Sequence, residues 1–184
     1  MKPTEELIHE HKAIKMMLGI MEKIAANIQN KKNVEVKDVE DIVNFLKIFA
    51  DKCHHGKEEN VLFPALLATG IPSENGPIGV MLYEHTQGRK YIQEMSDGAT
   101  NLKNQDAASA QSIANAMLNY CTLMQNHILK EENVLFVLAD QRLNAPKQEE
   151  ILAKFEQIEE DVVGHGIHEK FHELLNQLKA KYID

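Results

Sequence analysis

A ten-residue segment occurs twice in this chain, at residues 54–63 and 127–136, and eight of its ten positions are identical. In each copy a histidine stands four residues before the first of two adjacent glutamates. On an α-helix this spacing points both side chains in the same direction, one turn apart. The repeat therefore predicts two helices that each present a His and a Glu together, as His54 with Glu58 and His127 with Glu131.

Apolar residues recur at steps of three and four along most of the chain, and proline and glycine gather between these stretches. The pattern is typical of amphipathic helices, and no stretch alternates as a strand would. We expect an all-α, up-down-up-down four-helix bundle with an additional C-terminal helical region. The expected helices run from Pro3 to the polar residues 27–33, through Val39 to just before Gly70, from Pro77 to Asp97-Gly98, from about Asp106 to before Asn144, and over 147–182 with a bend or break at 164–166.

The length of 184 residues suits one domain, with residues 1–142 as the bundle and 143–184 as an extension packed on it. The net charge of −8, without a basic cluster, argues against nucleic acid as a partner. No signal-peptide run and no apolar stretch of roughly 18 to 20 residues is present, so no membrane contact is expected. We expect a cytoplasmic monomer or homodimer.

The repeated pairs continue the apolar stripes of their helices and are therefore predicted to face the core. Burying two carboxylates beside imidazoles is tolerable only when a cation or a full set of hydrogen bonds neutralises them. His11 and His85 lie on the apolar stripes of the other two helices. The predicted metal ligands are His11, His54, Glu58, His85, His127 and Glu131.

Other polar residues near these six are predicted to be bystanders. His9 is about 200° from His11 around the helix, and His55 is about 100° from His54, so both are expected on the flanks. Solvated flank positions are also expected for Lys57, Glu59, Lys130 and Glu132. Tyr120 is expected to pack in the core, with a hydrogen bond that supports the site as the alternative. Cys53 and Cys121 are expected to be reduced, buried thiols.

Two further histidine patterns offer alternatives. The Glu-x-x-His spacing of ferritin-like carboxylate proteins occurs at Glu6 with His9 and at Glu169 with His172, but without the separate glutamates that such a site needs. The residues 165, 168 and 172 are histidines that share a face if the chain is helical there. A surface or packing face is the favoured interpretation, and a lid or a weak metal site is the alternative.

Four imidazoles and two carboxylates suit two metal ions, with each carboxylate bridging both ions and each ion taking two histidines. An oxo or hydroxo bridge would leave one coordination position open on each ion. This mixed nitrogen and oxygen ligation favours iron over a closed zinc site, with manganese as the less favoured choice.

His11, the paired H-x-x-x-E-E segments and residues 76–85 resemble the hemerythrin-like HHE cation-binding family, especially the di-iron domain of the bacterial repair-of-iron-centres proteins. The resemblance covers roughly residues 4 to 140 and implies a di-iron four-helix bundle with the same six ligands. Oxygen-carrying hemerythrins have a histidine where Met81 stands here, which argues against plain oxygen carriage. The cysteine-containing domain of the repair proteins has no counterpart in these residues, so a repair role that depends on it is not expected.

The predicted function is a non-haem di-iron protein that binds or reduces dioxygen, nitric oxide or a peroxide, in oxidative or nitrosative stress defence and with a redox-partner protein. No catalytic residue is expected beyond the metal centre. The alternative is a sensor of oxygen, redox state or iron, or an iron-handling module, without turnover.

Overall fold

The computed structural model describes residues 1–104, 106–162, 164 and 167–183, and within these ranges it is helical, with no strand. Its α-helices are α1 (Pro3–Gln29), α2 (Val36–Phe45), α3 (Phe63–Leu67), α4 (Pro77–Lys103), α5 (Ser109–Lys130), α6 (Phe136–Arg142), α7 (Ala145–Val162) and α8 (Ile167–Tyr182). Three π-helical segments continue them: η1 (Leu46–His55), η2 (Glu58–Leu62) and η3 (Glu131–Leu135). The expected all-α class is confirmed.

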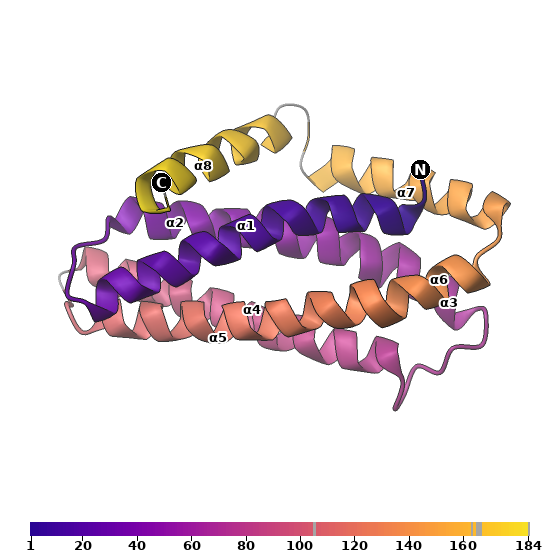
Figure 1. Cartoon of the computed structure of the whole chain (residues 1–184), viewed down its shortest axis with the longest axis horizontal. Helices are drawn as coiled ribbons and strands as arrows, with labels where there is room; N and C mark the ends of the chain where they lie inside the picture. The colour runs from indigo at the N-terminus through magenta and orange to yellow at the C-terminus, as the bar shows by residue number, and fades with distance from the viewer. Residues whose placement is uncertain (105, 163, 165–166, 184) are drawn as a thin grey trace.

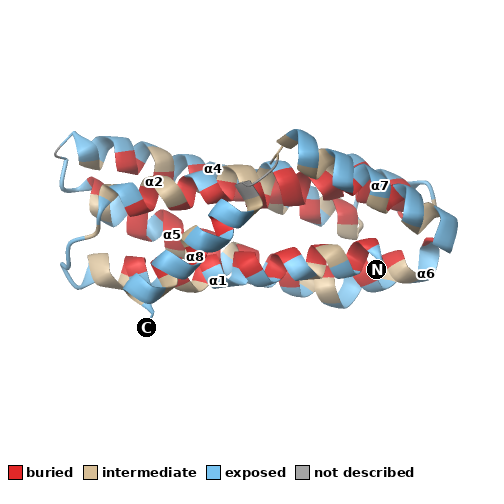
Figure 2. Ribbon diagram, turned by 90° about the horizontal axis from the view of Figure 1, so that it is seen from above, coloured by how far each residue is buried: buried red, intermediate tan, exposed pale blue. Residues whose placement is uncertain are grey.

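The long helices pack side by side along the longest axis of the molecule, with α5 against both α1 and α4, and α2 against α4 (Figure 1). Their buried residues form stripes that face one another inside the bundle, while the outer faces are exposed (Figure 2). This is the arrangement that the three-and-four periodicity predicts, because one apolar stripe per helix is removed from water.

The core consists of two apolar clusters with buried polar residues between them. Along α1, Leu7 belongs to one cluster and Ile14 to the other, and the fully buried His11 lies between. Along α4, His85 separates Met81 from Ile92 in the same way. A polar layer thus crosses the bundle at one level.

The expected end of the third helix at Asp97-Gly98 is wrong, because α4 continues to Lys103. A Cβ atom on Gly98 would lie 2.6 Å from Cγ1 of Ile113 on α5. The glycine therefore serves the close approach of α4 and α5 rather than the end of a helix.

The C-terminal region covers one side of the bundle. α7 packs against α1, η1 and η2, and α8 packs against α1 and α2. The expected break near Gly164 agrees with the gap between α7 and α8, and Gly164 has a left-handed φ of 70° that favours glycine. Residues 165 and 166 lie outside the described part. Across the described helices, none combines the length and apolarity that a membrane span requires.

Candidate metal centre

Histidines from four helical segments meet in the bundle interior as two pairs. Nε2 of His11 lies 3.1 Å from Nε2 of His54, and Nε2 of His85 lies 3.1 Å from Nε2 of His127. All four side chains are buried. In each pair two imidazole nitrogens converge on one place, as two ligands of one ion do.

The two buried glutamates connect the pairs. The Oε1 and Oε2 atoms of Glu131 lie 3.0 Å from Nε2 of His127 and 3.3 Å from Nε2 of His11, respectively. Those of Glu58 lie 3.8 Å from Nε2 of His54 and 3.5 Å from Nε2 of His85. Each carboxylate therefore faces one imidazole of each pair, which is the placement of a carboxylate that bridges two ions. The structure thus brings together all six of the predicted ligand residues.

A bound cation would neutralise the buried negative charge of the two glutamates in this layer. None of the four oxygens of Glu58 and Glu131 has a well-formed hydrogen bond from the described residues, although both side chains are completely buried. Burial and the nearby charge of Glu131 raise the pKa of Glu58 well above its usual value. Burial alone would also raise the pKa of Glu131. The interactions of this carboxylate with His127 and His11 outweigh burial, so the pKa of Glu131 lies well below its usual value. Buried carboxylates without donors are costly, and a bound metal removes that cost.

A second set of carboxylates orients the imidazoles from outside. Each Nδ1 atom lies within hydrogen-bond distance of a glutamate: His11 with Glu132 at 2.9 Å, His54 with Glu10 at 2.7 Å, His85 with Glu59 at 2.7 Å and His127 with Glu84 at 2.9 Å. A proton on Nδ1 that is donated to a carboxylate leaves the lone pair of Nε2 directed inward. This is the usual support of a metal-binding histidine.

Basic residues hold the outer glutamates in turn, and the two halves of the chain match. The equivalent contacts are Lys57 to Glu10 and Lys130 to Glu84, and Lys15 to Glu132 and Arg89 to Glu59. Each repeated segment thus supplies an inward histidine, a buried glutamate that faces both histidine pairs, a glutamate for the histidine of another helix, and a lysine. The centre has an approximate twofold repeat.

Helical periodicity did not identify Glu10 and Glu84, although the sequence around them carries a signal. Both precede a central histidine, and a basic residue follows that histidine by four positions, as Lys15 and Arg89. The two Glu-His pairs are 74 residues apart, close to the 73 that separate His54 from His127. This second, shorter similarity extends the match between the two halves of the chain to α1 and α4.

The expectation of solvated flank charges is wrong for Lys57, which is fully buried. Its ammonium contacts Glu6, Glu10 and, from α7, Glu159 at 2.8, 2.6 and 3.0 Å. Glu59 and Glu132 are only 24% and 23% exposed, because they hold His85 and His11. Helical phase alone identifies an inward face but does not show which flank residues a neighbouring helix will cover.

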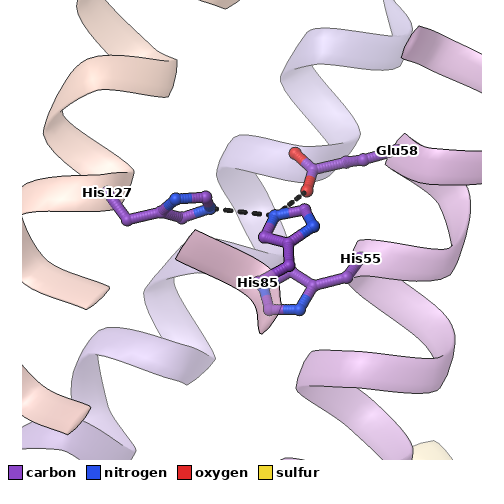
Figure 3. Close-up of side chains that lie close together, drawn as sticks. All are labelled: His55, Glu58, His85 and His127. Atoms are coloured by element: carbon purple, nitrogen blue, oxygen red, sulfur yellow. Dashed lines mark hydrogen bonds and ion pairs between the residues drawn. The ribbon is translucent and has the colours of Figure 1, made fainter. Parts of the chain in front are cut away.

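The expected flank position of His55 is also wrong, while that of His9 is correct, since His9 is exposed. His55 is buried, and its ring stacks on that of His85 with the centroids 3.8 Å apart and the planes at 13° (Figure 3). Its segment is π-helical, so each turn holds more residues and successive side chains are rotated by less than the roughly 100° of an α-helix. His54 and His55 can therefore both face inward.

The remaining histidine patterns have other roles in the described residues. Glu6 contacts Lys57, and its expected partner His9 is exposed. The His168 ring lies 5.3 Å from that of Phe49 and 5.6 Å from that of His172, which agrees with a packing face. The third member of that predicted face, residue 165, lies outside the described part.

The predictions for Tyr120, Cys53 and Cys121 agree with the structure. Tyr120 is fully buried in the apolar core, and its hydroxyl has no partner among the described residues. Cys53 and Cys121 are free, buried thiols.

Comparison with known families gives one finding. The family described as hemerythrin HHE cation binding domain matches residues 2–139. Searches of curated proteins and of solved structures found no match. The matched range contains all the residues of the centre and ends before α7 and α8.

Proposed function

This chain belongs to the hemerythrin HHE cation-binding family, and from that premise we propose that it is a non-haem di-iron protein that binds or reduces a small oxidant. The observation that supports two ions is the pair of buried carboxylates without hydrogen-bond donors, Glu58 and Glu131, each facing an imidazole of both histidine pairs. His11 and His54 would hold one ion, and His85 and His127 the other. The carboxylates would bridge them, together with an oxo or hydroxo group.

The surrounding residues suit chemistry that must be kept away from bulk water. The ring of Phe136 stacks on His11 at 5.6 Å, and the ring of Phe63 stacks on His85 at 5.9 Å. Bound iron would supply electrons and an open coordination position for dioxygen, nitric oxide or a peroxide. A redox-partner protein would restore the electrons, and defence against oxidative or nitrosative stress is the role we propose.

The proposal keeps the finer expectations about architecture. In it the long helical segments run up, down, up and down. Residues 1–142 form the di-iron bundle, and residues 143–184 are an extension of the same domain. Similarity to the repair-of-iron-centres proteins stays a prediction, because the family match spans the broader group.

A sensor without turnover is the second candidate, and one chain of contacts favours it. Glu159 on α7 contacts Lys57, Lys57 contacts Glu10, and Glu10 holds Nδ1 of His54. A change in charge at the metal centre therefore has a direct route to a helix that lies outside the family match. In this version the oxidant changes the contacts of α7 rather than being consumed.

The first test is anaerobic purification followed by iron quantitation. We expect two irons per chain in the wild type and far fewer in Glu131→Ala and His127→Ala. His9→Ala changes an exposed histidine outside the centre and should retain both irons. Equal iron content in all four proteins would contradict the assignment of the centre.

The second test separates the two functions. The reduced protein is mixed with dioxygen, nitric oxide and hydrogen peroxide in turn, and its spectrum is followed by stopped flow. Repeated turnover with a reductant supports the enzyme, and a stable adduct supports the sensor. The absence of any spectral change with all three would contradict oxidant binding.

A further inference from the structure

A cavity of about 420 Å³ opens at the end of the bundle where α1 and α4 end and where α2 and α5 begin (Figure 1). This volume lies within the range of about 300–1,000 Å³ that is usual for small-molecule sites. On α1 the lining begins at Ile28, 17 residues after His11, which corresponds to roughly 25 Å along a helix. The cavity is therefore separate from the metal centre, and a ligand bound in it would be no part of the di-iron site.

Much of the lining of this cavity is apolar. Val39 and Ile113 belong to the buried core, and Ile28, Val34 and Leu102 are partly buried side chains that pack against it. A ligand with an apolar chain would remove the remaining exposed surface of these five residues from water, which is favourable.

Two adjacent lysines, Lys31 and Lys32, give the cavity a positive charge. Both side chains are exposed, and neither has an ion pair or a hydrogen bond with another described residue. The described lining contains no acidic residue, although the chain as a whole has a net charge of −8. An apolar wall beside two unpaired ammonium groups is complementary to a molecule that has an apolar chain and an anionic headgroup.

The backbone at Lys31 is a second unusual feature of this site. Its φ of 57° is left-handed. Its amide donates a hydrogen bond to the carbonyl of Ile28, and the amide of Lys32 donates one to the carbonyl of Asn27, both at 2.9 Å. This pattern is the Schellman motif, in which the left-handed residue is usually glycine. Lysine is less favourable than glycine in this conformation, but it keeps an ammonium group at the cavity.

We propose that this cavity binds one free amphiphile of the fatty-acid class, with its chain against the five apolar residues and its carboxylate at Lys31 and Lys32. A bilayer is a less suitable source of the same chemistry, because a site that docks on a membrane needs large apolar side chains that insert into it. None of the exposed large apolar side chains in the described part of the chain lines the cavity.

Decanoate is the probe, used with the full-length protein below the concentration at which it forms micelles. Isothermal titration calorimetry measures its affinity. NMR of labelled isoleucine methyl groups reports where it binds, since Ile28 and Ile113 line the cavity. We expect one decanoate per chain and shifted signals from both residues. Decanol has the same chain without the charge and should bind about tenfold more weakly, because it forms no ion pair with either lysine.

Variants test the charge and the cavity separately. Lys31→Gly combined with Lys32→Gln should weaken decanoate binding about tenfold. Lys31→Gly alone should not lower the unfolding temperature, because glycine is favoured at this position, so weaker binding would not reflect loss of the fold. Ala110→Phe places a ring in the cavity and should abolish binding. Lys23→Gln removes an exposed lysine of α1 outside the cavity and should bind as the wild type does.

Three results would overturn the proposal. Equal affinity for decanoate and decanol would exclude an anionic ligand. Wild-type affinity for decanoate in Ala110→Phe or in the double lysine variant would place the amphiphile elsewhere and leave the two lysines a role only at the end of α1. Sedimentation of the protein with phosphatidylglycerol vesicles, without binding of decanoate, would identify a membrane surface instead of a free ligand.

Discussion

The ammonium of Lys57 lies 2.6 Å from one oxygen of Glu10, and the other oxygen of Glu10 lies 2.7 Å from Nδ1 of His54. Lys130 has the equivalent contact with Glu84 in the second half of the chain. The environments differ, because the Lys57 side chain is fully buried while that of Lys130 is 42% exposed. The covering residues are Glu159 and Phe155 of α7.

This difference predicts unequal effects of the same substitution. Lys57→Met leaves the buried carboxylate of Glu10 without its cation, so we expect a loss of about 3–5 kcal/mol in the free energy of unfolding. Lys130→Met removes a partly solvated ion pair and should cost about 1 kcal/mol or less. Urea unfolding of both metal-free variants measures the difference. Equal losses would show that α7 does not isolate Lys57 from water.

Removing an outer carboxylate should weaken metal binding, although this side chain holds a histidine and does not itself face the metal positions. Glu84→Ala removes the partner of Nδ1 of His127, so the imidazole is no longer held in one tautomer and orientation. We expect metal affinity to fall about 10- to 100-fold, measured by competition with a chelator. Glu94→Ala, an exposed glutamate on the same helix, is the matched control. A Glu84→Ala affinity equal to that of the control would exclude a supporting role for this carboxylate.

Alanine substitutions at two glycines should change the stability of the protein in opposite directions. A Cβ atom on Gly98 would lie 2.6 Å from Cγ1 of Ile113, so Gly98→Ala forces α4 and α5 apart and should destabilise the protein by about 1–3 kcal/mol. In α1 a Cβ atom on Gly19 meets nothing closer than Ile183 at 3.9 Å. Gly19→Ala should therefore stabilise the protein by about 0.5–1 kcal/mol through helix propensity. Thermal unfolding of both variants tests the pair, and the same sign in both would contradict the close approach of α4 and α5.

The buried thiol of Cys121 should make the free energy of unfolding depend on pH in the alkaline range. Burial raises the pKa of this thiol to about 12, whereas an unfolded thiol has a pKa of about 8.5. The stability that the buried neutral thiol contributes is therefore complete below the unfolded pKa and is lost as the pH rises toward the folded value. Wild-type protein should lose about 2 kcal/mol more than Cys121→Ala between pH 8 and pH 10.5 in urea unfolding. Parallel losses in the two proteins would argue against a buried, neutral thiol.

The spacing of residues along each helix was enough to place the six residues of the polar layer in the core. The stripe positions of His11, His54, Glu58, His85, His127 and Glu131 predicted that they face the core, and the structure brings them together. Their role as ligands remains a prediction. The prediction of place succeeded because both the apolar stripe and the inward polar residues follow from the period of one helix, a local property.

The outer carboxylates could have been found partly from the sequence. Glu10 and Glu84 each precede a central histidine, but their contacts with His54 and His127 are made between helices. Spacing along one helix does not give the rotation of its neighbour, so these partners appear only when the helices are packed.

By itself, the sequence determined the all-helical class, the inward faces and the duplicated pairing of His with Glu, because backbone hydrogen bonding sets these within each helix. Only the tertiary structure decided that His55 turns inward and that Lys57 is sealed from water. The first depends on a π-helical segment, in which hydrogen bonds reach one residue further and the α-helical phase no longer applies. The second depends on α7, which is about 100 residues away along the chain and replaces water around Lys57 with Glu159 and the ring of Phe155.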